Sequence, residues 1–136
     1  MTLNTEPSER LASIREVGSF RYSLVYEEGS EHRQKTGESL IVLVPGVPGS
    51  ERDFRHLAPL IACWSPVVRI VFPGFGLLNH ELEAPSSTGD RGQYLMNIAE
   101  AEGWRSIFVI GHSMGGVAAM QWAQMDERVK TLVLMC

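Results

Sequence analysis

Blocks of apolar and polar residues alternate along the chain, and the period of each block predicts a secondary-structure element. Uninterrupted apolar runs rich in β-branched residues indicate strands covered on both faces, whereas a stretch in which every second residue is apolar indicates a strand with one covered face. Apolar residues spaced three and four positions apart indicate helices. On this basis we expect strands at 19–26, 39–44, 67–72, 106–110 and 131–135, and helices at 54–61, 90–101 and 114–124.

Polar and glycine-rich segments separate these elements and set the expected domain boundary. Residues 1–17 are predicted to form an N-terminal tail, which is followed by one domain over 18–136. The charged segment 27–38 is expected to be a loop. Asp53 is a candidate cap for the helix that follows it, and Pro59 predicts that this helix is kinked or divided into two short ones.

The alternation of strands and helices predicts an α/β fold with a mostly parallel, doubly wound sheet. In such sheets, ligands bind beyond the carboxyl ends of the strands. Three loops leave predicted strands at that edge, and all three are rich in glycine: PGVPGS at 45–50, PGFG at 73–76 and GHSMG at 111–115. Because glycine lets a backbone approach a ligand closely, these loops are the expected site.

The pentapeptide GHSMG, between a predicted strand and a predicted helix, resembles the nucleophile elbow of the α/β-hydrolase family, which has the form G-x-S-x-G. The resemblance covers about residues 18–136 and implies that Ser113 is the nucleophile. In such an elbow the nucleophile occupies a strained turn with positive φ, and small residues, here Gly111 and Gly115, let strand and helix approach each other. The side chain of His112 is expected to point away from the nucleophile and to pack.

Two other loops resemble segments of the same family. The run LVPGVPGSERDF resembles the segment after the third strand, which supplies half of the oxyanion hole from a backbone amide, by position that of Val47. The amide of Met114, directly after the nucleophile, is implied to supply the other half. The sequence departs from the family pattern at Pro45, where His is common, and at Phe72, where Asp is usual in the loop after the fourth strand.

The catalytic triad of the family is incomplete in this sequence. Its members follow the order Ser, acid, His, but no His follows Ser113, and the only later acids are Asp126 and Glu127, which we expect to face solvent. Three explanations stay open. The chain is a fragment of a longer hydrolase, with its sheet truncated after about the sixth strand; it is a short natural isoform; or an upstream histidine such as His80 acts as the base.

The resemblance implies a serine hydrolase of the carboxylesterase or lipase type, acting on a small-molecule ester, thioester or amide without a cofactor. Because the base is missing, we expect this 136-residue chain to be inactive alone. A serine at the elbow argues against epoxide hydrolases and haloalkane dehalogenases, which use a carboxylate, whereas cofactor-independent lyases and peroxidases of this fold also carry serine. The alternative to an enzyme is a catalytically inactive interaction module.

Composition and charge argue against several other classes. The net charge of −4, with acidic and basic residues interspersed, argues against nucleic-acid binding. The polar N-terminus is unlike a signal peptide, no apolar run approaches the roughly 18 residues of a membrane-spanning helix, and two cysteines make no disulfide framework, so a cytoplasmic protein is expected. No metal site is expected at His80; His32 is expected to be solvated, and His56 is expected to be a surface or packing residue. The oligomeric state stays open.

Overall fold

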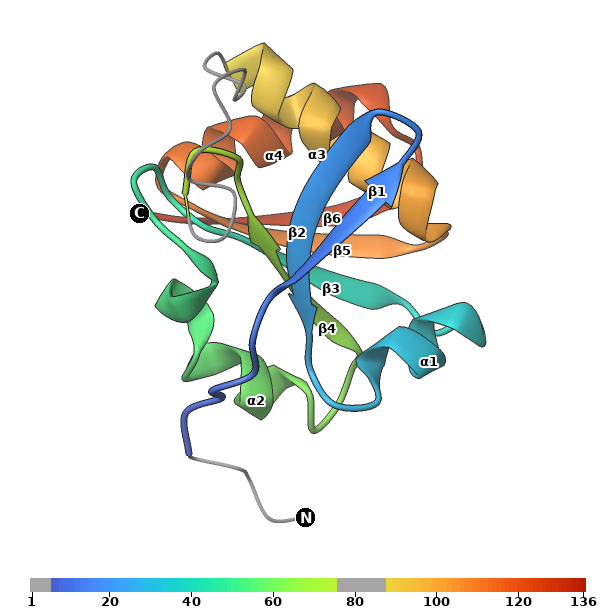
Figure 1. The fold of residues 1–136 in the computed structure, drawn as a ribbon, viewed down its shortest axis with the longest axis vertical. Helices are drawn as coiled ribbons and strands as arrows, with labels where there is room; N and C mark the ends of the chain where they lie inside the picture. The colour runs from blue at the N-terminus through green and yellow to red at the C-terminus, as the bar shows by residue number, and fades with distance from the viewer. Residues whose placement is uncertain (1–5, 76–87) are drawn as a thin grey trace.

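The computed structural model describes residues 6–75 and 88–136. Within these ranges the chain forms six strands, four α-helices and one 3-10 helix, namely β1 (Ser13–Val17), β2 (Phe20–Tyr26), α1 (Ser30–Lys35), β3 (Leu40–Val44), η1 (Glu51–Phe54), α2 (Leu57–Ile61), β4 (Val67–Val71), α3 (Thr88–Glu102), β5 (Ile107–His112), α4 (Met114–Met125) and β6 (Val129–Met135). Figure 1 shows a central sheet with α3 and α4 on one side and α1 and α2 on the other.

The six strands form one sheet in the order β1-β2-β4-β3-β5-β6. β4, β3, β5 and β6 are parallel, while β1 and β2 form an antiparallel hairpin whose second strand pairs with β4. The mostly parallel sheet with helices on both faces confirms the α/β class predicted from the sequence.

The direction in which the sheet grows reverses at β3. From β3 the chain moves to its neighbour β4, and from β4 it crosses back over β3 to reach β5. The connections that leave β3 and β5 therefore diverge to opposite faces, and in sheets of this kind the point of divergence is where ligands usually bind. Val44 at the end of β3 lies opposite Gly111 near the end of β5, so the two strands end at the same level.

Apolar side chains fill both faces of the sheet. The larger core lies between the sheet and α3 and α4, and it contains Trp104 and Trp122, whose rings are 6.4 Å apart. The smaller core, on the other face, includes Leu43 and Phe54. Val42 belongs to the larger core and its neighbour Leu43 to the smaller one, as the alternation of side chains along a strand requires.

The N-terminal segment differs from the expected tail over 1–17. Ser13–Val17 form β1, an edge strand that pairs with β2 along its whole length. Before this strand, the amide of Ser8 donates a hydrogen bond to the carbonyl oxygen of Arg55 (2.7 Å). Only two of the five residues of β1 are apolar, and both are exposed, so no apolar period marks this strand in the sequence.

The segment 27–38, predicted to be a loop, contains the helix α1. The buried residues of α1 are Ser30 and Gln34, two polar side chains one turn apart. A helix that buries polar residues has no apolar stripe, and the stripe is the signal by which a helix is recognised in a sequence.

The cap that precedes η1 is Ser50 rather than Asp53. The hydroxyl oxygen of Ser50 accepts the amide of Arg52, and the amide of Ser50 donates to the carboxylate of Asp53, so Asp53 acts as the reciprocal member of a capping box. The region forms two short helices, one of the two alternatives predicted, but the break falls at residues 55–56 and Pro59 lies within α2 instead of interrupting it.

A carboxylate ties the β1–β2 hairpin to the end of α3. Glu102 accepts hydrogen bonds from the hydroxyls of Tyr22 and Tyr26, the second at 2.7 Å, and from Arg15 at 2.7 Å. Trp104 Nε1 donates to the hydroxyl of Tyr26 (2.8 Å). Burial and the contact with Glu102 raise the pKa of both tyrosines above the usual value, so both hydroxyls stay protonated donors.

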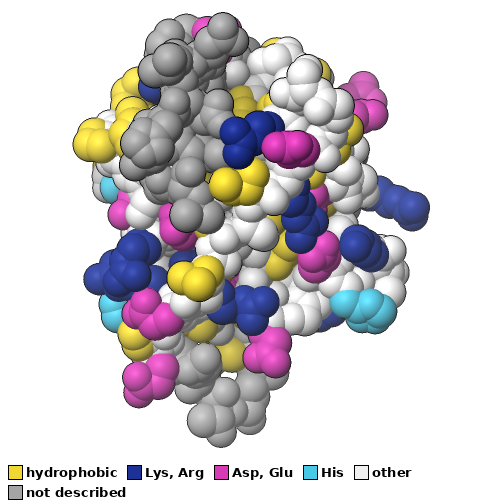
Figure 2. Space-filling view, viewed as in Figure 1, with side chains coloured by type: hydrophobic (Ala, Val, Ile, Leu, Met, Phe, Trp, Pro, Cys, Tyr) yellow, Lys and Arg dark blue, Asp and Glu magenta, His cyan; other side chains and the backbone are white. Residues whose placement is uncertain are grey.

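The surface in Figure 2 carries charges of both signs, with Lys and Arg side chains interspersed among Asp and Glu. Within the part of the chain that the structure describes, every helix is too short or too polar to cross a lipid bilayer.

Asp126, which follows α4, is buried, in contrast to the expectation that it faces solvent. Its carboxylate accepts hydrogen bonds from Trp122 Nε1 (2.8 Å) and from Arg128 Nε (2.8 Å), residues on either side of the turn into β6. Burial alone would raise the pKa of Asp126, but the hydrogen bonds from Arg128 and Trp122 outweigh burial and hold the pKa below its ordinary value. Glu127 is exposed, as expected.

Replacing Asp126 by Asn is expected to lower the free energy of unfolding at pH 7 by about 1–3 kcal/mol, because Arg128 loses its charged acceptor. A carboxylate with a depressed pKa stabilises the fold above its unfolded pKa, about 3.9, and this contribution is lost as the pH falls through the folded value. The difference between variant and wild type should therefore shrink below about pH 4.

Urea unfolding at pH 7 and at about pH 3 measures both differences. The matched control is Glu127→Gln at the exposed neighbour, which should change the free energy of unfolding by less than about 0.5 kcal/mol. A destabilisation of Asp126→Asn that is as large at the lower pH as at pH 7 would contradict the role of the ionised carboxylate.

Candidate active site

Ser113 is the single residue between β5 and α4, at the carboxyl edge of the parallel strands. Its φ is 53° and its ψ is −123°, and among the described residues it is the only one other than glycine with a positive φ. Holding a side chain in such a conformation costs about 1–3 kcal/mol, so surrounding contacts must impose it. The residue is exposed.

Close backbone packing at two glycines imposes this turn. A Cβ on Gly111 would lie 2.6 Å from the Cα of Gly116, at the point where β5 and α4 touch. A Cβ on Gly115 would overlap the carbonyl oxygen of Pro45 and lie 2.7 Å from that of Val44, at the point where α4 meets the loop after β3. Real Cβ atoms essentially never come within 3.0 Å of another group, so neither position accepts a side chain without a shift of backbone.

Two hydrogen bonds hold the backbone of Ser113. Its amide donates to the carbonyl oxygen of Met135 at the end of β6 (2.9 Å), and its carbonyl accepts the amide of Gly116 (2.9 Å). The next amide, that of Met114, belongs to the first turn of α4. Amides in a first turn have no acceptor within the helix, and the helix dipole gives them a partial positive charge that favours an anion.

The loop after β3 lies directly against this turn. A Cβ built on Gly46 would be 3.5 Å from the Cβ of Ser113 and 3.4 Å from Nδ1 of His112. Val47, the next residue, is half-buried, and its side chain packs against the larger core. The structure thus brings together two of the three glycine-rich loops that the sequence singles out.

The histidines differ in their relation to Ser113. His112 is half-buried beside the loop after β3. His32 and His56 are exposed. His32 belongs to α1, which leads into the start of β3, so His32 lies at the end of the strands opposite to Ser113. His80 lies outside the described residues. Across residues 6–75 and 88–136, no three His, Cys, Asp or Glu side chains are grouped so that they could hold a metal ion.

Two contacts of the site have no signal in the sequence. The approach of Gly46 to His112 joins the loop after β3 to the last residue of β5, and the hydrogen bond from Ser113 to Met135 ends on a backbone carbonyl. A contact of this kind depends on the strand order and the register, which a local motif does not contain.

The alpha/beta hydrolase family profile matches residues 41–136. The chain is 29% identical over 133 residues to a 2-hydroxy-6-oxononadienedioate/2-hydroxy-6-oxononatrienedioate hydrolase of Cupriavidus pinatubonensis, a match that covers 90% of this chain and 46% of that protein. It is 33% identical over 101 residues to a serine hydrolase-like protein of Danio rerio, covering 70% of this chain and 30% of that protein. The chain thus spans less than half the length of these relatives.

Solved structures share this fold. A membrane phospholipase A matches with a TM-score of 0.75 at 23% identity, over 92% of this chain and 39% of that one. Epoxide hydrolase A from Mycobacterium thermoresistibile matches with a TM-score of 0.67 at 22% identity, over 95% of this chain and 39% of that one. These likenesses agree in fold with the profile match over residues 41–136, and the chain belongs to the alpha/beta hydrolase family.

Proposed function

We propose that this chain carries the nucleophile and the oxyanion hole of a serine hydrolase that cleaves an ester, thioester or amide. The observation that carries the proposal is the backbone of Ser113, which has a φ of 53° between β5 and α4 and has the loop of Gly46 packed against it. Strain of this kind clusters at active sites, where surrounding packing maintains it. The hydroxyl of Ser113, an exposed residue, is the proposed nucleophile.

The proposed oxyanion hole consists of the backbone amides of Val47 and Met114. Met114 begins α4, where the helix dipole favours negative charge. Val47 follows Gly46, whose backbone lies beside the nucleophile. The amide of Ser113 donates to Met135 and is therefore already occupied. Two preorganised amides that face a developing oxyanion are the usual source of electrostatic stabilisation in acyl transfer.

In the proposed reaction, the hydroxyl oxygen of Ser113 attacks the carbonyl carbon of the substrate while a base accepts the hydroxyl proton. The carbonyl oxygen becomes an oxyanion that accepts hydrogen bonds from the two amides. The intermediate then collapses to an acyl-serine, and the leaving group departs with the proton. Attack by water on the acyl-serine releases the acid and restores the hydroxyl.

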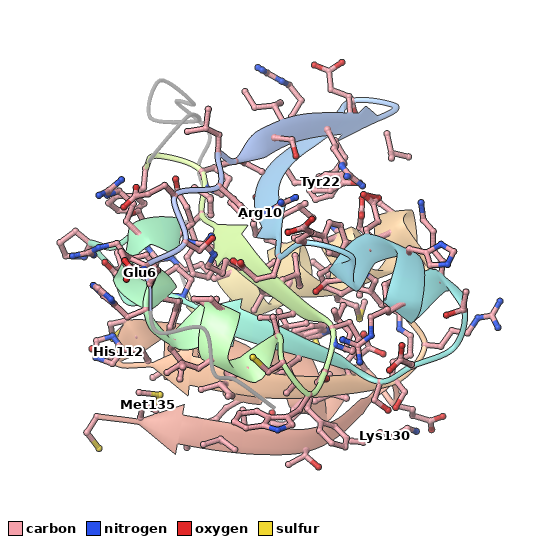
Figure 3. All side chains as sticks on the ribbon, turned by 90° about the horizontal axis from the view of Figure 1, so that it is seen from below. Glu6, Arg10, Tyr22, His112, Lys130 and Met135 are labelled. Carbon is pink, nitrogen blue, oxygen red and sulfur yellow. The ribbon has the colours of Figure 1, made fainter. Side chains whose placement is uncertain are left out.

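We further propose that the base comes from polypeptide other than these 136 residues. No His follows Ser113 in the sequence, and the curated relatives are more than twice as long as the part that this chain matches. β6 supports a larger unit, since it is an edge strand whose Val133 and Leu134 are 46% and 52% exposed. In Figure 3, β6 borders the sheet from Lys130 to Met135. An apolar edge strand is a ready partner for a further strand.

The proposed substrate is a small molecule that carries an acyl group. One relative is named as a hydrolase of 2-hydroxy-6-oxononadienedioate, and another as serine hydrolase-like. Both names support hydrolysis by an enzyme of this family, and the proposed chemistry requires no cofactor.

Labelling with a fluorophosphonate probe tests the proposed function, because the probe reacts with activated serines. In the protein as its own cells make it, we expect one labelled peptide that contains Ser113, and no labelling of the Ser113→Ala variant. The control variant Ser19→Ala, at an exposed serine in the β1–β2 turn, should keep the label. A folded protein whose Ser113 stays unlabelled would instead favour the inactive interaction module.

A further inference from the structure

Arg69 is the one charged residue of the buried strand β4, and its guanidinium connects segments that are far apart in the sequence. We propose that Arg69 is a positioning residue, because it anchors the end of the loop that leads from β3 into η1 and thereby fixes the backbone amide of Val47. The inference rests on the proposed function, in which this amide is one of the two donors to the oxyanion.

The guanidinium of Arg69 contacts the chain at three places. Its Nη1 donates a hydrogen bond to the carbonyl oxygen of Glu51 (3.0 Å), and its Nη2 donates to the hydroxyl of Ser8 (3.0 Å). Nη2 also lies 2.7 Å from the carboxylate of Glu27, which is buried like Arg69 itself. Glu51 is the first residue of η1 and directly follows the loop 45–50, so the first of these contacts holds the downstream end of that loop.

A second connection runs from Arg69 to the other end of η1. The amide of Ser8 donates to the carbonyl oxygen of Arg55 (2.7 Å), the residue that follows η1. The guanidinium is thus joined to Glu51 directly and to Arg55 through Ser8. Because β4 is paired with β2 on one side and with β3 on the other, Arg69 projects from a fixed backbone (Figure 1).

η1 is packed against the peptide unit that carries the Val47 amide. A Cβ built on Gly49 would be 2.5 Å from the carbonyl oxygen of Gly46 and 2.6 Å from a carboxylate oxygen of Asp53 in η1. Both distances are well below van der Waals contact, so no methyl-sized space remains between these groups. The carboxylate of Asp53 also accepts the amide of Ser50 (3.3 Å). Because the carbonyl of Gly46 and the N–H of Val47 belong to one planar peptide unit, a displacement of η1 displaces the donor as well.

The two ends of the loop are held by different contacts. At the upstream end, a Cβ on Gly115 would overlap the carbonyl oxygen of Pro45, so α4 lies directly against the loop. At the downstream end, Arg69 holds Glu51. Removing the guanidinium therefore releases the downstream end, while the upstream end and the strand before it stay in place.

Two variants separate this role from the neutralisation of a buried charge. In Glu27→Gln the ion pair is lost, but the amide oxygen still accepts a hydrogen bond and Arg69 keeps its contact with Glu51. In Arg69→Met/Glu27→Met the contact with Glu51 is lost, but no charge is left buried, and such a replacement is often neutral for stability. The first variant should therefore unfold at a lower urea concentration than the wild type, and only the second should lose order in the loop.

Relaxation of ¹⁵N nuclei in the 136-residue chain tests the proposal without any requirement for activity. The order parameter of the Val47 amide is expected to be about 0.85 in the wild type and in Glu27→Gln, and below about 0.6 in Arg69→Met/Glu27→Met. Val42 in β3 should stay at about 0.85 in all three proteins, which reports that the sheet is retained.

The matched control makes the same substitutions at an exposed ion pair. Arg21→Met/Glu16→Met removes a pair of the β1–β2 hairpin (3.0 Å) and should leave Val47 rigid. A Val47 amide that stays rigid in Arg69→Met/Glu27→Met overturns the proposal, and so does one that is as mobile in Glu27→Gln as in that double variant. Arg69→Lys takes the place of the double variant if the latter does not fold. Lysine keeps a positive charge beside Glu27 but lacks the planar fork that reaches several acceptors, so Val47 should lose order here too.

The rate of labelling at Ser113 tests the consequence for the reaction. In protein that labels, Arg69→Met/Glu27→Met should slow labelling by about tenfold, whereas Glu27→Gln should change the rate by less than about twofold, because only the former misplaces a donor. A double variant that labels at the wild-type rate overturns the proposal. Wild-type protein that does not label contradicts the proposed function alone, since the relaxation measurement is independent of labelling.

Discussion

Replacing Gly115 by Ala is expected to lower the free energy of unfolding by about 3 kcal/mol, at the upper end of ordinary overpacking effects. The added methyl would overlap the carbonyl oxygen of Pro45 and lie 2.7 Å from that of Val44. Both obstacles are backbone atoms at the end of a buried strand, so neither can rotate away as a side chain would. Either α4 or the loop after β3 must shift, and both carry parts of the proposed oxyanion hole.

Gly116→Ala is the matched control, because Gly116 is the next residue of the same helix and gains the same helix propensity, about 1 kcal/mol. A Cβ on Gly116 would meet Leu134 Cδ2 at 3.2 Å and the carbonyl oxygen of Gly111 at 3.3 Å, and the first of these is the end of a flexible side chain. Gly116→Ala should therefore stay within about 1 kcal/mol of the wild type in urea unfolding. Equal effects of the two substitutions would show that contact with Pro45 does not determine the turn.

The buried strands can be predicted from the sequence because their environment is nearly uniform. All residues of β4 are buried, and its run VVRIV is apolar except for Arg69, whose guanidinium is paired with Glu27 (2.7 Å). The elbow is predictable for a different reason. Gly111, Ser113 and Gly115 lie within five positions, so one short motif contains all three, and the steric conflict at Gly111 is with Gly116 a few residues further along the chain.

The remaining features depend on partners that are distant in the sequence. β1 has no apolar period, and Arg15 in this strand is held by Glu31 of α1 and Glu102 of α3. The burial of Asp126 likewise depends on the path of the chain from α4 into β6, which brings Arg128 onto its carboxylate. A local pattern cannot contain such contacts, because they exist only once the strand order is set.

The 136-residue chain is expected to hydrolyse p-nitrophenyl butyrate no faster than its own Ser113→Ala variant. A serine hydroxyl is a weak nucleophile near pH 7 unless a base accepts its proton, and loss of the serine or the histidine of a triad lowers kcat by about 10⁶. The sequence has no His after Ser113, and His32 and His56 are exposed. Initial rates of the two purified chains at equal concentration, corrected for the uncatalysed reaction, measure the difference.

A wild-type chain that turns over at about 1 s⁻¹ or faster, with activity lost in Ser113→Ala, would contradict this prediction and place the base within these residues. His80→Ala would then be the first variant to examine, because His80 follows β4 in the sequence, and His56→Ala the second. Slow turnover that is equal in the wild-type chain and in Ser113→Ala has a different meaning. An oxyanion hole alone leaves about 10³-fold catalysis over water. This remaining activity would therefore come from the amides of Val47 and Met114 without a base.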